Sequence, residues 1–223
     1  MNSIVKLGDC MDFMREMPDK AYNLAIVDPP YGIGINSQFK NSGGLGSKSM
    51  FRQTKGQGAK EWDSKTPTEE YFKELFRVST NQIIWGGNYF LNHLPSTRCM
   101  LIWDKMNGGN NMADAEIAWT SIDGSVRMFR MHHFSRGYGT KIHLTQKPVA
   151  LYTWLLKNYA KEGDKILDTH GGSMSSVIAA IKGGFDITCF ELDKDYYEKA
   201  KERIENFISQ ENMFAEKPII TFS

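Results

Sequence analysis

The sequence predicts an α/β protein built on a doubly wound, mostly parallel β-sheet. Short apolar runs of strand length alternate with segments of helical length along most of the chain, as expected for a parallel sheet with helices on both faces. Several of these runs end in an acidic residue or a glycine turn, where such sheets bind ligands. The 223 residues suit one domain, 1–223.

The expected elements follow in order. The apolar runs predict strands over 4–7, 23–28, 82–85, 99–103, 116–121, 165–168 and 186–191, with a further strand inside 127–141. Helices are expected over 9–17, 66–78, 148–159, 175–182 and 195–208. Thr66, Pro67 and Glu69 predict an N-cap, a first-turn proline and a capping-box acid for the second helix. Gly183-Gly184 should end the fourth.

Composition narrows the class of protein. Hydrophobic residues make up 41% and charged residues 24%, which allows a full core. The three cysteines are widely spaced and form no Cys-x-x-Cys, so we expect neither a disulfide framework nor a metal site. Signal-peptide features and an apolar run near the ~18 residues of a membrane span are both missing. We therefore expect a cytoplasmic protein without a membrane partner.

Positive charge is segregated although the net charge is only +1. Segments 36–60 and 127–141 contain no acid, and the first is rich in Gly, Ser and Asn. We expect 36–62 to be a mobile basic loop, and 105–141 to hold a small DNA-recognition region inserted in the domain. A solvated surface is the other interpretation. The candidate phosphate-binding residues are Lys40, Lys48, Arg52, Lys55, Lys60, Arg127, Arg130, Arg136 and Lys141.

Asp28-Pro29-Pro30-Tyr31 follows a buried strand directly. The prolines fix the backbone and lack N–H groups, so the loop offers two acceptors, the Asp28 carboxylate and the Pro29 carbonyl, beside the Tyr31 ring. Two acceptors that grip an aromatic amino group favour its tetrahedral, more nucleophilic form, and this interaction strengthens towards the transition state. The same four residues are also a common surface turn.

This loop resembles the catalytic motif of amino-group DNA methyltransferases, in which Asp, Asn or Ser precedes Pro-Pro and an aromatic residue. The resemblance extends to three further stretches, Leu7-Gly8-Asp9-Cys10, Ile83 to Asn88 and Leu101 to Lys105. It implies a Rossmann-like S-adenosylmethionine-dependent fold that includes an antiparallel strand. It further implies that Asp28, Pro29, Pro30 and Tyr31 are catalytic. The Asp form is common among adenine-N6 enzymes of this family.

His143-Leu144-Thr145-Gln146-Lys147-Pro148 resembles a second family element. Lys147 lies where Pro148 opens a helix, a position at which the helix macrodipole disfavours a cation. An anionic partner such as the methionine carboxylate of the cofactor would explain it, and a solvated lysine is the alternative.

The cofactor turn is expected at Asp168-Thr169-His170-Gly171-Gly172-Ser173, where strand, acid and glycines lead into a helix. The family usually has Pro-Phe where this chain has Thr169-His170, and Gly where it has Met174. Glu191 ends the next strand, at a distance that suits a ribose-binding acid. The expected cofactor residues are Asp9, Cys10, Asp28, Lys147, Asp168, Thr169, His170, Gly171, Gly172, Ser173, Glu191 and Leu192.

The catalytic loop precedes the Lys147 element, which precedes the cofactor turn, and this is the circularly permuted motif order of the family's β class. The resemblance implies an enzyme of bacterial, phage or plasmid origin that methylates a flipped-out adenine in double-stranded DNA. The chain has little room for a separate recognition domain, so a short target site or a homodimer is expected. Cytosine-N4 or RNA adenine methylation, or an inactive DNA-binding homologue, are the alternatives.

Overall fold

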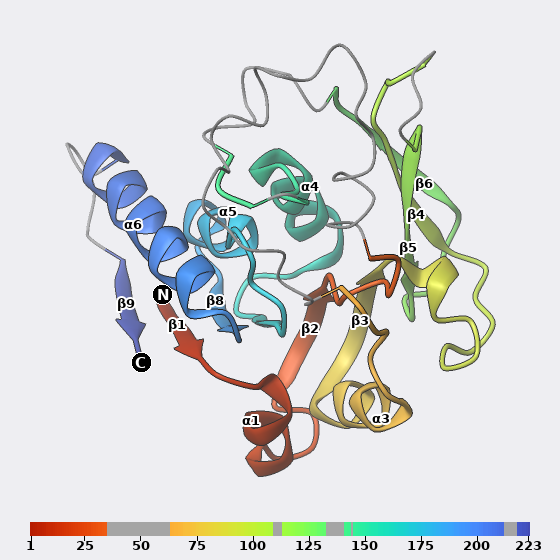
Figure 1. Cartoon of the computed structure of the whole chain (residues 1–223), viewed down its shortest axis with the longest axis horizontal. Helices are drawn as coiled ribbons and strands as arrows, with labels where there is room; N and C mark the ends of the chain where they lie inside the picture. The colour runs from red at the N-terminus through yellow and green to blue at the C-terminus, as the bar shows by residue number, and fades with distance from the viewer. Residues whose placement is uncertain (35–62, 109–112, 133–140, 144, 212–217) are drawn as a thin grey trace.

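The computed structural model describes residues 1–34, 63–108, 113–132, 141–143, 145–211 and 218–223 (Figure 1). The predicted loop 36–62 lies outside these residues, as does Arg136. Cys10, Cys99 and Cys189 are buried free thiols. None of the described helices is long and apolar enough to cross a membrane.

A nine-stranded sheet runs through the described chain in the order β6-β4-β5-β3-β2-β7-β8-β1-β9. The strands are β1 (Asn2–Leu7), β2 (Tyr22–Val27), β3 (Ser79–Trp85), β4 (Met100–Asp104), β5 (Ala115–Thr120), β6 (Arg127–Arg130), β7 (Lys165–Asp168), β8 (Asp186–Glu191) and β9 (Ile219–Phe222). Strand β5 is antiparallel to both of its neighbours, whereas the other paired strands are parallel. The expected mostly parallel sheet with an antiparallel strand is confirmed.

The chain reverses its direction of travel across the sheet between β2 and β7. These strands are neighbours, with Leu24 opposite Ile166, but β2 leads outward to β3 and β7 leads the other way to β8. The carboxyl ends of parallel strands meet at one edge, and ligands bind at the point where the order reverses. The loops after β1, β2, β7 and β8 therefore converge.

Helices cover both faces of this sheet (Figure 1). The described helices are α1 (Cys10–Glu16), α3 (Glu69–Val78), α4 (Val149–Tyr159), α5 (Ser175–Gly183) and α6 (Lys194–Glu211), with a short 3₁₀ helix η2 (Gly87–Tyr89). Strand β2 shows the division: Leu24 and Ile26 pack in the core of α4, α5 and α6, whereas Ala25 and Val27 pack in the core of α1 and α3. A strand buried on both faces explains its unbroken apolar run.

The second helix starts two residues later than predicted. Helix α3 begins at Glu69, and its N-cap is Thr68, whose hydroxyl accepts a hydrogen bond from the Tyr71 N–H. Thr66 precedes the helix, and Glu69 occupies the first helical position instead of closing a capping box. There the acid still interacts favourably with the helix dipole.

The structure describes residues 105–108, 113–132 and 141 of the range 105–141, in which a small inserted DNA-recognition region is expected. Strands β5 and β6 both lie in this range, and both are strands of the main sheet, paired with β4. Ala118 and Trp119 of β5 are buried in the core, whereas Met128 of β6 is exposed. Strand β9, which sequence patterning did not predict, pairs with β1 at the opposite edge.

Candidate active site

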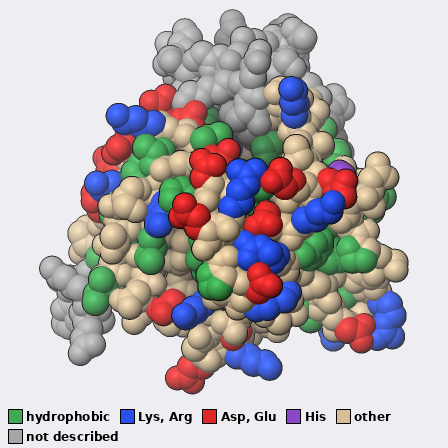
Figure 2. Space-filling view, turned by 90° about the horizontal axis from the view of Figure 1, so that it is seen from below, with side chains coloured by type: hydrophobic (Ala, Val, Ile, Leu, Met, Phe, Trp, Pro, Cys, Tyr) green, Lys and Arg blue, Asp and Glu red, His purple; other side chains and the backbone are tan. Residues whose placement is uncertain are grey.

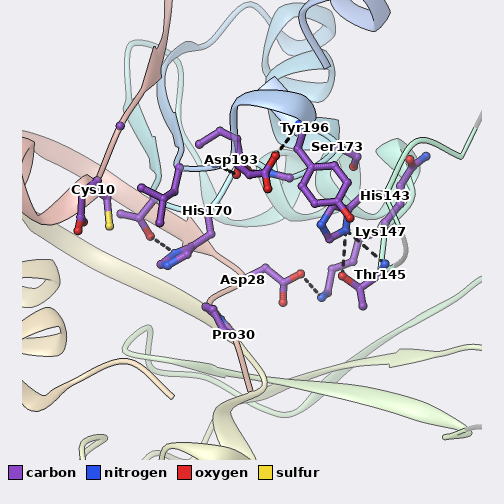
Figure 3. A pocket seen from close by; sticks show the side chains of 18 of the residues that line it. Cys10, Asp28, Pro30, His143, Thr145, Lys147, His170, Ser173, Asp193 and Tyr196 are labelled. Carbon is purple, nitrogen blue, oxygen red and sulfur yellow. Dashed lines mark hydrogen bonds and ion pairs between the residues drawn. The ribbon is translucent and has the colours of Figure 1, made fainter. Parts of the chain in front are cut away.

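A cavity of about 350 Å³ lies where the carboxyl ends of the central strands converge (Figure 3). Its volume is in the range of small-molecule sites. Among its lining residues are all but one of those predicted to hold the cofactor: Asp9, Cys10, Asp28, Lys147, Thr169, His170, Gly171, Gly172, Ser173, Glu191 and Leu192. The topology thus brings together segments that are distant in sequence.

Glu191 ties the end of β8 to the glycine turn. One of its carboxylate oxygens accepts a hydrogen bond from the Gly172 N–H at 2.6 Å, and the other accepts one from the Asp193 N–H at 2.8 Å. Burial raises the Glu191 pKa, and these backbone donors oppose the rise. Asp9 has a comparable local role, because it caps α1 by accepting from the Met11 N–H.

Asp168 lies beneath the cavity and is not part of its wall. Its carboxylate accepts hydrogen bonds from the Ser176 hydroxyl at 2.5 Å and from the His170 N–H at 3.1 Å. Burial raises the Asp168 pKa to about 7 against these two donors. In the described structure Asp168 shapes the cofactor turn, in contrast to the direct contact that the sequence predicted.

The residues at which the turn departs from the usual family pattern are held by specific conformations and contacts. Met174 adopts a left-handed conformation with φ 53° at the position where the family usually has glycine, and it is fully buried. A side chain at Gly171 would approach the Cys189 sulfur within 2.7 Å, so glycine is required there. The Thr169 hydroxyl bonds the Tyr71 hydroxyl of α3 at 2.7 Å and His170 Nδ1 at 2.9 Å. The replacements at 169 and 170 therefore join the turn to α3.

The catalytic loop predicted at Asp28 to Tyr31 follows β2 directly. The Tyr31 hydroxyl donates to Asp28 Oδ1 at 2.6 Å, and the Tyr31 ring stacks on Tyr89 with centroids 4.9 Å apart. A side chain at Gly86 would overlap the Tyr31 ring, with atoms 2.2 Å apart. Asp28 and Pro30 line the cavity, whereas Pro29 and Tyr31 do not. The Tyr31 ring thus packs against η2 in this structure and is not presented to the cavity.

Lys147 has protein carboxylates as its anionic partners. Its ammonium lies 2.5 Å from Asp28 Oδ2 and 3.0 Å from Glu116 Oε2, and Glu116 also pairs with Lys105 at 2.6 Å. The chain itself therefore supplies anions for Lys147, and a contact with the cofactor carboxylate stays a prediction. The contact is drawn in Figure 3 between Asp28 and Lys147.

Burial and charge act against each other in this group. Burial alone would lower the Lys147 pKa, but Asp28 and Glu116 raise it. Burial would raise the Glu116 pKa, but Lys147 and Lys105 lower it. For Asp28, burial raises the pKa, Lys147 opposes the rise and Glu116 adds to it. Lys147 and Glu116 are therefore held in their charged forms.

Asp63 holds the backbone of the predicted catalytic loop by hydrogen bonds. One of its carboxylate oxygens accepts from the backbone N–H groups of Tyr31 at 2.8 Å and Gly32 at 3.0 Å. Its carbonyl accepts from the Gly34 N–H at 3.0 Å. With only 4% of its surface exposed, Asp63 fixes the backbone that follows Asp28. Sequence reasoning did not select this residue.

The cavity wall contains further residues that the sequence analysis did not select: Gly8, His143, Thr145, Gln146, Tyr152, Asp193 and Tyr196. His143 packs on Tyr196 with ring centroids 4.2 Å apart. Burial, aided by Lys147, lowers the His143 pKa to about 4, so its ring is neutral near pH 7. Most of these residues are close in sequence to Lys147 or Glu191, which were predicted, and this closeness in sequence could have identified them.

Three of the predicted DNA-binding residues are described, namely Arg127, Arg130 and Lys141, and all are exposed. Arg130 pairs with Asp104 at 3.3 Å. The others, Lys40, Lys48, Arg52, Lys55, Lys60 and Arg136, lie outside the described residues. Across the part that the structure describes, no group of three or more His, Cys, Asp or Glu residues could hold a metal ion.

The face formed by α1 and α3 is mixed in charge. Figure 2, seen from the lower edge of Figure 1, shows acidic and basic side chains intermingled there. Ion pairs within and between these helices account for part of this mixture, for example Arg15 with Glu70 and Lys73 with Glu69. A phosphate backbone prefers a surface of one sign, so this face is a poor candidate for DNA contact.

The sheet order and the cavity at the carboxyl ends of its strands define a Rossmann-like α/β protein with a nucleotide-type site. Comparison with known proteins identifies the family. The model of the N6/N4 DNA methylase family matches residues 84–202, more than half of the chain. The protein therefore belongs to this family of amino-group DNA methyltransferases.

Its curated relatives include the type II methyltransferase M.HinfI of Haemophilus influenzae, 22% identical over 92% of this chain and 68% of the relative. They also include the putative methylase YubD of Escherichia coli, 22% identical over 88% of each chain.

Solved structures share the fold. A putative DNA modification methylase from Thermus thermophilus, complexed with S-adenosyl-L-methionine, aligns with a TM-score of 0.58 at 16% identity over 99% of both chains. The cytosine-N4-specific PvuII DNA methyltransferase aligns with a TM-score of 0.58 at 12% identity, over 93% of this chain and 91% of its own. At identities this low, these structures show that the fold is shared and do not identify the target base.

Proposed function

We propose that this protein transfers a methyl group from S-adenosyl-L-methionine to the N6 amino group of adenine in double-stranded DNA. The observation that carries the proposal is the position of Asp28 at the wall of a cavity that is also lined by the glycine turn and Glu191. An acceptor for an amino group thus lies next to a site suited to a nucleoside-containing cofactor.

The residues of the cavity fit S-adenosyl-L-methionine. Gly172 lines the cavity without a side chain, and Glu191 offers carboxylate oxygens beside it for ribose hydroxyls. Asp9 and Leu192 complete the wall near Glu191. When bound, this cofactor supplies an electrophilic methyl group. Two neighbours in fold, the Thermus thermophilus methylase and M1.HpyAVI, are known as complexes with it.

Asp28 would accept a hydrogen bond from the amino group of the target base, and the Pro29 carbonyl would accept the second. These bonds favour a tetrahedral nitrogen with a localised lone pair. The bound cofactor would supply the methyl group and keep the electron pair of its carbon–sulfur bond, while Asp28 and the Pro29 carbonyl would orient the amino nitrogen towards that methyl group. The proton lost from the nitrogen would pass to solvent. The products are the methylated base and S-adenosyl-L-homocysteine.

The amino group is inaccessible inside a base-paired stack, so the target base must leave the helix. Tyr31 would stack on this base only after its ring leaves Tyr89, since the two rings are stacked in the present structure. Exposed Arg127, Arg130 and Lys141 would contact phosphates and give salt-sensitive binding. A second subunit would enlarge the DNA surface.

Cytosine-N4 methylation is the second candidate, because the PvuII enzyme with the same fold is cytosine-N4-specific. The experiment that separates the two uses cofactor with a labelled methyl group, duplex DNA of mixed sequence, and nucleoside analysis of the product. We expect label in N6-methyl-2′-deoxyadenosine. Label in N4-methylcytosine would replace the proposal, and an RNA substrate tests the remaining alternative.

Asp28→Ala tests the mechanism. It should reduce methyl transfer at least 100-fold, since removing one transition-state hydrogen-bond partner costs about 10²–10³ in rate. Calorimetry with S-adenosyl-L-methionine should still show binding to this variant. Transfer near the wild-type rate would contradict the role of Asp28, and absence of cofactor binding to the wild type would favour an inactive DNA-binding protein.

A further inference from the structure

Four charged side chains that are distant in sequence form a chain of ion pairs behind the catalytic loop. Asp28 follows β2, Lys105 follows β4, Glu116 lies at the start of β5 and Lys147 precedes α4. Because β5 is antiparallel to its neighbours, its beginning lies at the edge where the parallel strands end. The order of contact is Asp28, Lys147, Glu116, Lys105, with alternating charge.

Lys147 is the most deeply buried of these four side chains, so its charge most needs partners within the protein. Its side chain is 2% exposed, against 18% for Asp28 and 21% for Glu116. A buried ammonium is costly unless it is paired at short distance. The Lys147 ammonium forms ion pairs with two carboxylates, Asp28 at 2.5 Å and Glu116 at 3.0 Å.

We propose that Lys147 is a positioning residue that presents Asp28 as an anion to the target amino group, and that Glu116 sets how strongly Lys147 holds it. This inference rests on the proposed function of Asp28. Lys147 fixes one carboxylate oxygen and the Tyr31 hydroxyl fixes the other. Each oxygen accepts two hydrogen bonds, so the carboxylate keeps capacity for the amino group while its orientation is fixed.

The two partners have opposite effects on Asp28, and this distinguishes the proposal from simple structural support. Lys147 lowers the Asp28 pKa, whereas the negative charge of Glu116 raises it. Lys147→Met should therefore raise the Asp28 pKa, and Glu116→Gln should lower it. The other titratable groups that interact with Asp28 are Tyr31, Tyr71, Tyr152 and Asp168. Lys147 also donates to the Tyr31 hydroxyl at 3.1 Å, so Lys147→Met removes that hydrogen bond together with the ion pair, whereas Glu116→Gln leaves it in place.

The primary measurement is the carboxylate ¹³C chemical shift of Asp28 as a function of pH, in full-length protein labelled at aspartate. Asp28→Asn identifies the signal. We expect the titration to move to higher pH in Lys147→Met and to lower pH in Glu116→Gln. Movement of both variants in the same direction, or of neither, would overturn the proposal. This readout needs no activity, so it decides the role of Lys147 even if the proposed reaction is wrong.

The kinetic measurement is the single-turnover rate of DNA methylation against pH. Its acid limb should move with the Asp28 titration, and moving the limb by about one pH unit changes the rate below it about tenfold. Glu74→Gln is the matched control, because Glu74 is similarly exposed, at 20%, and is paired with Arg77 on α3. Both the Asp28 titration and the acid limb should be unchanged in this control. If wild-type protein titrates as expected but methylates no DNA, the proposed function fails separately.

Discussion

At the scale of single residues, Asp63 is the residue whose substitution should affect the catalytic loop most specifically. Asp63→Ala leaves the N–H groups of Tyr31 and Gly32 without their acceptor, and a buried unsatisfied donor costs about 1–3 kcal/mol. The loop would shift to find other partners. We expect methyl transfer to fall by roughly 10- to 100-fold, since small misplacements of reacting groups have effects of this size. Single-turnover rates measure it.

Asp63→Asn is the control for this prediction. The amide keeps an oxygen that can accept from both N–H groups, so its rate should stay within a few-fold of wild type. If Asn and Ala reduce the rate equally, the negative charge of Asp63 matters and the loop-anchoring interpretation fails.

Residues within motifs were predictable, whereas their partners from elsewhere in the chain were not. The turn from Thr169 to Ser173 and Glu191 carry a local pattern, and they line the cavity. Glu116 has no such pattern: it reaches Lys147 only because β5 is antiparallel and starts at the ligand-binding edge. The carboxylate partners of Lys147 were not predicted for the same reason, because strand order brings Asp28 and Glu116 to it.

At the scale of elements, α3 links a helix N-cap to the cofactor turn. Thr68 caps the helix, and Tyr71 in its first turn bonds the Thr169 hydroxyl. Thr68→Ala should lower the free energy of unfolding by about 1 kcal/mol, the usual cost of a lost N-cap. Thr66→Ala makes the same chemical change at the exposed position that sequence patterning selected, and it should cost less than about 0.5 kcal/mol.

Denaturant titration of the two threonine variants compares these positions directly. A larger loss for Thr66→Ala would show that the helix begins earlier in solution than in this structure.

Element types were more predictable than element ends. Strand β2 and helix α5 were expected from apolar patterning and from Gly184, whose φ of 74° ends the helix as predicted. The start of α3 was missed because two threonines flank Pro67 and either can act as a cap. Strand β9 has four residues, and its pairing with β1 joins distant parts of the chain, which no local pattern can reveal.

At the scale of the whole molecule, one sheet connects every part of the site. Strands β1, β2, β7 and β8 deliver Asp9, Asp28, the cofactor turn and Glu191 to one edge, and β4 and β5 deliver Lys105 and Glu116. The relative positions of these groups therefore depend on the integrity of the sheet. This dependence predicts that a destabilising substitution in an outer strand lowers the stability of the whole sheet.

Phe222→Ala tests that prediction at β9, the edge strand farthest in the sheet from β3, β4 and β5. Phe222 packs on the core, with its ring edge-on to Tyr197 at 6.4 Å, and truncating a half-buried Phe should cost about 1–2 kcal/mol. If the sheet unfolds as one unit, the fluorescence transition of Trp85, Trp103 and Trp119 moves to a lower denaturant concentration. The shift of its midpoint equals this loss of free energy divided by the m-value.

Ile219→Ala is the control for Phe222→Ala, because Ile219 lies on the same strand but is 66% exposed, and its transition should be unchanged. If the Phe222 variant loses helical circular dichroism early while its tryptophan transition stays at the wild-type midpoint, the β9 edge unfolds independently. In that case the cofactor end of the cavity, which β1 and β8 form, would be separable in stability from the end that holds Asp28 and Lys147.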